Sequence, residues 1–156
     1  MALSDTNEPK GRSAAARLPR LTFGLGAAAF VAIGLLHTLT QATTLSGAEV
    51  QAAYRAGGDI DISGRVIDGW DLFAGTSLLM GFFAVAIGLL DAAVLVDSGR
   101  HHRLPPVSVS AVNVAVLVGI VAVGATLLGP IQLVGGSVGI VLFGITLNAA
   151  RRSPSA

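Results

Sequence analysis

A stretch of nineteen uncharged residues at positions 72–90 constrains this chain more than any other feature. It lies between Asp71 and Asp91, and as a helix rising about 1.5 Å per residue it would extend for roughly 28 Å. Because the hydrocarbon core of a bilayer is about 30 Å thick, this length fits a membrane-spanning helix. We therefore predict that lipid is the solvent for this part of the chain.

The composition extends that prediction to the whole protein. Hydrophobic residues make up 53% of the chain and charged residues only 12%, whereas soluble domains carry about 25% charged residues. The twenty glycines suit helices that pack closely within lipid. The chain has no cysteine, which excludes disulfides, thiolate metal sites, cysteine nucleophiles and the quinone-linked thiol oxidoreductases.

Hydropathy predicts an all-α polytopic membrane protein, a bundle of four transmembrane helices. Residues 104–150 form a run of forty-seven residues without a charge, about 70 Å as one helix, so the run must fold back on itself. The break signal is Gly129-Pro130. A transmembrane domain at 21–150 would hold four spans, at about 21–40, 71–96, 107–128 and 131–150.

The remaining segments are polar. Residues 1–20 are predicted to be a disordered basic tail and residues 151–156 a second tail. A cleavable signal peptide is the alternative for the N-terminal region, although glycines at 24, 26 and 34 favour a packed helix. In the 41–69 loop, Ser46 and Glu49 have capping-box spacing, which predicts a short amphipathic helix at about 47–56. The alternation of Ile60 and Ile62 with aspartates fits an extended piece or a loop.

The basic residues predict the topology. Eight of the ten lie in the N-terminal tail, after the second span and at the C-terminus, and with four spans these segments share one side. The 41–69 loop holds Arg55 and Arg65 together with four acidic residues. The positive-inside rule then places both termini in the cytoplasm, the short helix outside and the protein in the inner (plasma) membrane.

Asp91 is the first candidate site residue, because a carboxylate within an apolar helix needs a polar partner or water. Helical spacing puts it on one small, polar face with Ser77, Gly81, Ala84 and Gly88. Counting residues from the helix ends predicts an inner polar cluster of Asp91, Asn113 and Asn148. This cluster could hold a proton, an ion or a lipid head group, or it could only lock helices together through Asn113 or an arginine.

His37 is the second candidate, at seventeen residues or about 25 Å from Arg20 and so near the outer face. Its neighbours at that depth would be Asp71, Thr76 and Gln132. A histidine beside a carboxylate can relay protons or contact a polar ligand, so these four residues form a predicted ligand-binding pocket. The alternative is a histidine at head-group level that bonds only to water or Asp71.

Other kinds of site are not expected. His101 and His102 are adjacent and face different ways, so no metal is predicted, and Arg100 to Arg103 fit contact with anionic lipid. No phosphate loop, nucleophile elbow or nucleic-acid-binding stripe occurs, and no cofactor is predicted. Gly135 and Gly139 have the spacing of a dimerisation motif, which serves packing within a bundle equally well.

With four spans, a histidine in the first and the sequence GWDLFAGTSLLMG at 69–81, the chain resembles the small four-helix membrane proteins of bacteria that are DoxX-like in the broad sense. The likeness covers residues 21–150 in hydropathy. It implies an accessory role beside oxidoreductases. The same architecture occurs in sterol isomerase-like enzymes, but this chain has no glutamate and no second histidine within a span, so isomerase chemistry is not expected.

Three functions follow as hypotheses. The first is a non-catalytic accessory or assembly subunit, whose partners are the bilayer and another membrane protein or a second copy. The second is a bundle that binds lipid or a lipophilic small molecule, or a small transporter-like protein, with the outer pocket around His37. A membrane enzyme is the least favoured, because His37 and Asp91 are about 20 Å or more apart in depth and cannot act together.

Overall fold

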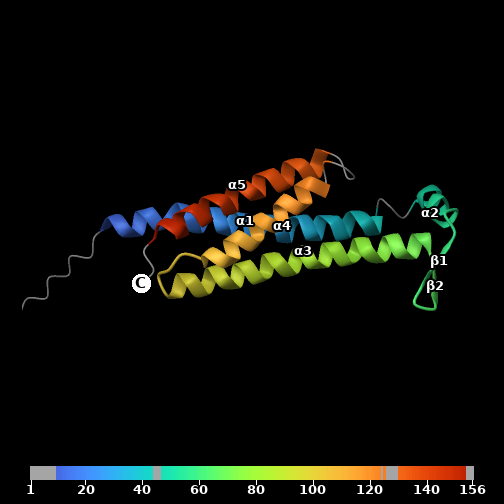
Figure 1. Cartoon of the computed structure of the whole chain (residues 1–156), viewed down its shortest axis with the longest axis horizontal. Coiled ribbons are helices and arrows are strands. Elements are labelled where there is room, and N and C mark those ends of the chain that lie inside the picture. Colours follow the sequence, from blue (N-terminus) through green and yellow to red (C-terminus); the bar gives the residue numbers. More distant parts are fainter. Residues whose placement is uncertain (1–9, 44–46, 124, 126–129, 154–156) are drawn as a thin grey trace, which may run out of the picture. The chain divides into compact units, whose positions relative to one another are not determined.

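The computed structural model describes residues 10–43, 47–123, 125 and 130–153, and for 10–15, 41–43 and 130–132 it describes the backbone alone. Within these residues the chain is almost entirely helical, which confirms the all-α prediction. The elements are α1 (Lys10–Thr43), α2 (Ala48–Arg55), β1 (Asp59–Ile62), β2 (Arg65–Asp68), α3 (Gly69–Arg100), α4 (Val107–Val123) and α5 (Pro130–Arg152) (Figure 1).

Among the residues that the structure describes, three helices are long and apolar enough to cross a membrane. The candidate spans are Ala16–Thr40 in α1, Gly69–Arg100 in α3 and Leu133–Arg152 in α5. Helix α4 is apolar too, but its 17 described residues are only about the minimum that a bilayer needs. The structure thus has the helices of a membrane protein, with three clear candidate spans.

The helices differ from the predicted ranges mainly at their ends. Helix α1 begins at Lys10 instead of residue 21, since alanine and arginine are good helix formers, and it runs through Pro19. The part of the predicted disordered tail at 10–20 is therefore helical, while residues 1–9 lie outside the described residues. Helix α3 extends beyond 71–96 at both ends. Pro130 is the first residue of α5, where its missing N–H costs nothing, but the predicted end of the third span at 124–128 is described only at residue 125.

The chain divides into two compact units, residues 1–26 with 91–156 (unit 1) and residues 27–90 (unit 2). In unit 1, helices α4 and α5 lie side by side, and the start of α1 lies beside the end of α5 (Figure 1). The ring of Phe23 meets Phe143 edge-on, with centroids 5.2 Å apart. The Thr146 hydroxyl bonds to the Pro19 carbonyl at 2.9 Å and pairs with the Thr22 hydroxyl at 3.1 Å. These buried contacts fasten α5 to α1.

Unit 2 contains α2 and an antiparallel hairpin of β1 and β2, in which Asp59 pairs with Asp68 and Ile60 with Ile67. Ser63 and Gly64 have φ values of 56° and 82°, so the two-residue turn has the twist that suits a hairpin. The Asp61 carboxylate accepts a hydrogen bond from the Gly64 N–H at 2.7 Å. Of the two alternatives for this segment, the extended piece is the one that forms.

Candidate functional site: polar contacts between packed helices

In unit 2, helices α1 and α3 approach each other through glycine. A Cβ atom at Gly34 would lie 2.6 Å from the carbonyl oxygen of Gly81, and one at Gly88 would lie 2.6 Å from that of Ala27. Only glycine allows backbones to come this close without displacing one helix. The space beside these glycines is therefore occupied by backbone atoms and by the side chains of Val85 and Val31.

His37 belongs to this contact and bonds to Ser77. The distance from its Nε2 to the Ser77 Oγ is 2.7 Å, and Ser77 is buried. One residue further along α1, the Thr38 hydroxyl donates to the Gly34 carbonyl at 2.9 Å. Ser77 was not among the predicted partners of His37, but its position on the small inward face of α3 is the signal that could have identified it.

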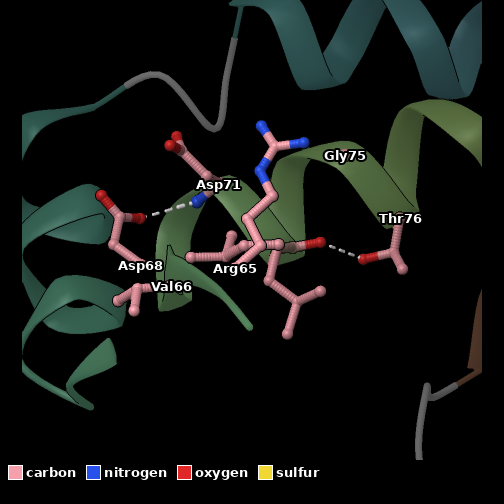
Figure 2. Close-up of a pocket in the computed structure, with 8 residues that line it drawn as sticks. Arg65, Val66, Asp68, Asp71, Gly75 and Thr76 are labelled. Carbon is pink, nitrogen blue, oxygen red and sulfur yellow. Dashed lines mark hydrogen bonds between the residues drawn. The ribbon is translucent and has the colours of Figure 1, made fainter. Parts of the chain in front are cut away.

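The structure describes the side chains of three of the four residues of the predicted outer pocket, and two of these three lie together. Asp71 and Thr76 do line one hollow of about 340 Å³, with Arg65 and Asp68 of the hairpin (Figure 2). His37 does not line it, and the side chain of Gln132 lies outside the described residues. The Thr76 hydroxyl donates to the carbonyls of Leu72 and Phe73 in its own helix. Arg65 is a lining residue that the sequence-based prediction omitted.

Asp68 joins this hairpin to the helices. Its Oδ1 accepts a hydrogen bond from the Asp71 N–H at 2.8 Å, which caps the N-terminus of α3 (Figure 2). Its Oδ2 lies 3.5 Å from Nε of Arg55 at the end of α2. One carboxylate thus ties α2, β2 and α3 together.

A second hollow of about 490 Å³ lies beside the first and shares Leu72 and Thr76 with it. Its wall is mainly apolar and includes Tyr54 and Phe73, whose rings stack with centroids 4.2 Å apart. Trp70 packs against both rings at 6.0 and 5.9 Å. Tryptophan and tyrosine, whose rings are amphipathic, are typical of a membrane interface.

In unit 1, Asp91 and Asn113 form a direct pair. The Asn113 amide donates to the Asp91 carboxylate at 2.8 Å, and the two residues are only 3% and 4% exposed. Asn148, the third residue of the predicted inner cluster, is exposed on α5. The pair therefore links α3 to α4 as a buried contact.

The chemistry that these residues could perform is limited by their surroundings. His37 and Ser77 have the spacing of a base and a nucleophile, but catalysis also needs an orienting group and room for substrate. Neither hollow is lined by His37 or Ser77, and the glycine contact occupies the adjoining space. Within the described residues, no group of three His, Asp or Glu side chains could hold a metal ion.

Comparisons of the chain with family models, with curated proteins and with solved structures give no match. The resemblance to DoxX-like proteins therefore stays a prediction.

Proposed function

We propose that this protein is a four-span integral membrane protein of the inner (plasma) membrane that acts as a non-catalytic accessory or assembly subunit. Helices α1, α3, α4 and α5 are its spans, both termini are cytoplasmic, and α2 with the hairpin is extracytoplasmic. The three candidate spans support the membrane assignment, and the 17-residue α4 is long enough for a fourth.

The distribution of basic residues supports this orientation. In unit 1, the Arg20 guanidinium donates to the Arg103 carbonyl at 3.0 Å, so the start of α1 lies beside the turn between α3 and α4. The Thr22 to Thr146 bond brings the end of α5, which carries Arg151 and Arg152, to the same region. Three basic segments therefore lie together, as the positive-inside rule requires of one membrane face.

The glycine contact between α1 and α3 is the observation that carries the accessory role. Gly34, Gly81 and Gly88 bring the backbones together, and His37 bonds to Ser77 of the neighbouring helix and lines neither of the two hollows. The alternative function, a lipophile-binding or transporter-like bundle, needs His37, Asp71, Thr76 and Gln132 in one outer pocket. The separation of His37 from the hollow that contains Asp71 argues against that arrangement.

Complementation of a deletion strain of the host tests the proposal. We expect His37→Ala to restore the host phenotype, since the residue contributes only a helix contact. Gly88→Leu should abolish complementation and the recovery of the intact protein in the membrane fraction, because its side chain would meet the Ala27 carbonyl. A His37→Ala protein that is abundant in the membrane but inactive would contradict the accessory role and favour a binding or catalytic one.

A further inference from the structure

Two unlike hollows adjoin at the start of α3. One is lined by charged and polar side chains, among them Arg65, Asp71 and Thr76. The other is mainly apolar, with Tyr54, Ile60 and Phe73 in its wall. Since Leu72 and Thr76 line both, a single molecule with a charged end and an apolar end could occupy the two together.

The polar hollow presents two charges of opposite sign. Figure 2 shows the Arg65 guanidinium and the Asp71 carboxylate extending to the same side of the hollow. Within the part of the chain that the structure describes, neither charge has an ion-pair partner, and they do not pair with each other. Asp68 differs, because it already contacts Arg55 and caps α3. Arg65 and Asp71 are thus available to a ligand that carries both an anion and a cation.

The surroundings indicate where such a ligand comes from. The apolar hollow lies at the beginning of a candidate span, and the next turns of α3 expose Leu78, Leu79 and Met80 by 45 to 59%. Side chains of this kind on a spanning helix face acyl chains. The ligand with a charged end and an apolar end is therefore a lipid.

We propose that the two hollows bind the head group of a zwitterionic phospholipid with a primary ammonium group, such as phosphatidylethanolamine. The phosphate contacts Arg65, the ammonium donates to the Asp71 carboxylate, and the glycerol and first acyl carbons lie against Leu72 and Phe73. A quaternary ammonium has no N–H to donate to Asp71. A lipid with net negative charge is disfavoured because residues 47–71 contain five acidic residues and two arginines.

This inference rests on the proposed membrane embedding of α3, and one experiment separates the two. Trp70 is the only tryptophan and packs beside the apolar hollow, so its fluorescence reports on this site alone. The full-length protein is reconstituted in phosphatidylcholine vesicles. Increasing fractions of phosphatidylethanolamine, phosphatidylcholine or phosphatidylglycerol, each brominated near the head group, are then added as quenchers.

We expect brominated phosphatidylethanolamine to reach half-maximal quenching at a mole fraction about three to five times lower than the other two lipids, the range expected for exposed charge pairs. Arg65→Gln and Asp71→Asn should each reduce this preference to near unity. The matched variants Arg100→Gln and Asp59→Asn, which remove the same charges from residues that line neither hollow, should keep it. Unchanged circular dichroism of each variant shows that the helices remain folded.

Equal quenching by the three lipids, or a preference that survives in both hollow variants, would overturn the head-group site while leaving the embedding intact. Absence of quenching by every brominated lipid would instead overturn the embedding of this end of α3. Soluble glycerophosphoethanolamine distinguishes the source of the ligand. If it changes Trp70 emission in phosphatidylcholine vesicles while brominated phosphatidylethanolamine shows no preference, the ligand is a soluble zwitterion and the lipid proposal is wrong.

Discussion

Polar side chains within the apolar helices bond chiefly to other helices or to their own backbone. Asp91 is bonded by Asn113, His37 by Ser77, and Thr146 by Thr22 and the Pro19 carbonyl. In hydrocarbon an unpaired polar group costs several kcal/mol, so each pair strongly favours one alignment of its two helices. These residues therefore specify how the helices pack.

The Asp91 to Asn113 pair gives a direct test at this scale. Asn113→Ala removes the donor and leaves a buried carboxylate with an unmet acceptor, which should lower the free energy of unfolding by about 1–3 kcal/mol. Asn148→Ala is the matched control, because this exposed side chain should change stability by less than about 0.5 kcal/mol. Thermal unfolding of both variants in the same detergent measures the difference. Equal losses would show that the pair contributes nothing specific.

One of these pairs was predicted from the sequence, and the partner of His37 was missed. Asp91 lies six residues before Asp97, just after the predicted end of its span, and Asn113 lies six residues after Val107, so counting along two antiparallel helices places them level. The partner of His37 depends instead on the rotation of α3, which turns by about 100° per residue. Thr76 and Ser77 have nearly the same depth, and Ser77 faces His37 because it shares the small face of α3 with Gly81, which packs against Gly34.

At the scale of the elements, the α1 to α3 contact should tolerate no added side chain. Gly34→Ala would place a Cβ atom 2.6 Å from the Gly81 carbonyl and 2.8 Å from the Val85 nitrogen, both of which are backbone atoms. We expect a loss of about 1–3 kcal/mol, the usual range for overpacking. Gly119→Ala in α4 meets nothing within 4 Å and should be neutral or stabilising by up to about 1 kcal/mol. Unfolding by heat compares the two, and a stabilised Gly34→Ala would contradict the close approach.

Two substitutions at one position of the hairpin turn should change its stability in opposite directions. Ser63 has a φ of 56°, which costs an L-residue free energy that glycine avoids. Ser63→Gly should therefore stabilise the β1 and β2 pairing by up to about 1 kcal/mol, and the β-branched Ser63→Val should destabilise it. Amide hydrogen exchange of Ile60 and Ile67, which are paired in the hairpin, measures both effects. If the Ser63→Gly and Ser63→Val variants showed equal amide protection, this turn geometry would be ruled out.

Element boundaries show what sequence patterns can and cannot supply. The break before α5 was predictable because Pro130 cannot continue a preceding helix. The range of α2 was predicted nearly correctly, but its N-cap is Gly47 without a side-chain cap hydrogen bond, and Ser46 lies outside the described residues. The early start of α1 was not predictable, since Pro9, Gly11 and Pro19 all argue for a tail. The sequence indicated the hairpin less clearly than the helices, through the alternation of isoleucine and aspartate before Ser63-Gly64.

Across the whole chain, acidic residues precede and begin α3, whereas basic residues end and follow it. The hairpin before this helix and its first turn are acidic, with Asp68 and Asp71, while Arg100 ends its last turn. After this helix, within the described residues, the remaining charges are Arg103, Arg151 and Arg152, all basic. Such asymmetry would orient the chain in a membrane, and it was readable from sequence because it depends on residue counts and not on packing.

The number of spans can be measured by finding on which side of the membrane each segment between the helices lies. The chain has no cysteine, so one introduced thiol can be labelled without background. We expect Asp59→Cys in β1 to react with a membrane-impermeant maleimide in intact cells. His101→Cys between α3 and α4, and Ser153→Cys after α5, should react only after permeabilisation. All three positions are exposed, so a lack of reaction reflects sidedness and not burial.

The decisive comparison is between His101→Cys and Ser153→Cys. If α4 and α5 both span, the two thiols are on the same side, because two crossings return the chain to where it began. If the 17-residue α4 does not cross the bilayer, α5 alone carries Ser153 to the opposite side and the two labelling patterns become complementary. That result would replace four spans by three and place the C-terminus outside. The bond between Thr22 and Thr146 argues against it, since it holds the end of α5 beside the basic start of α1.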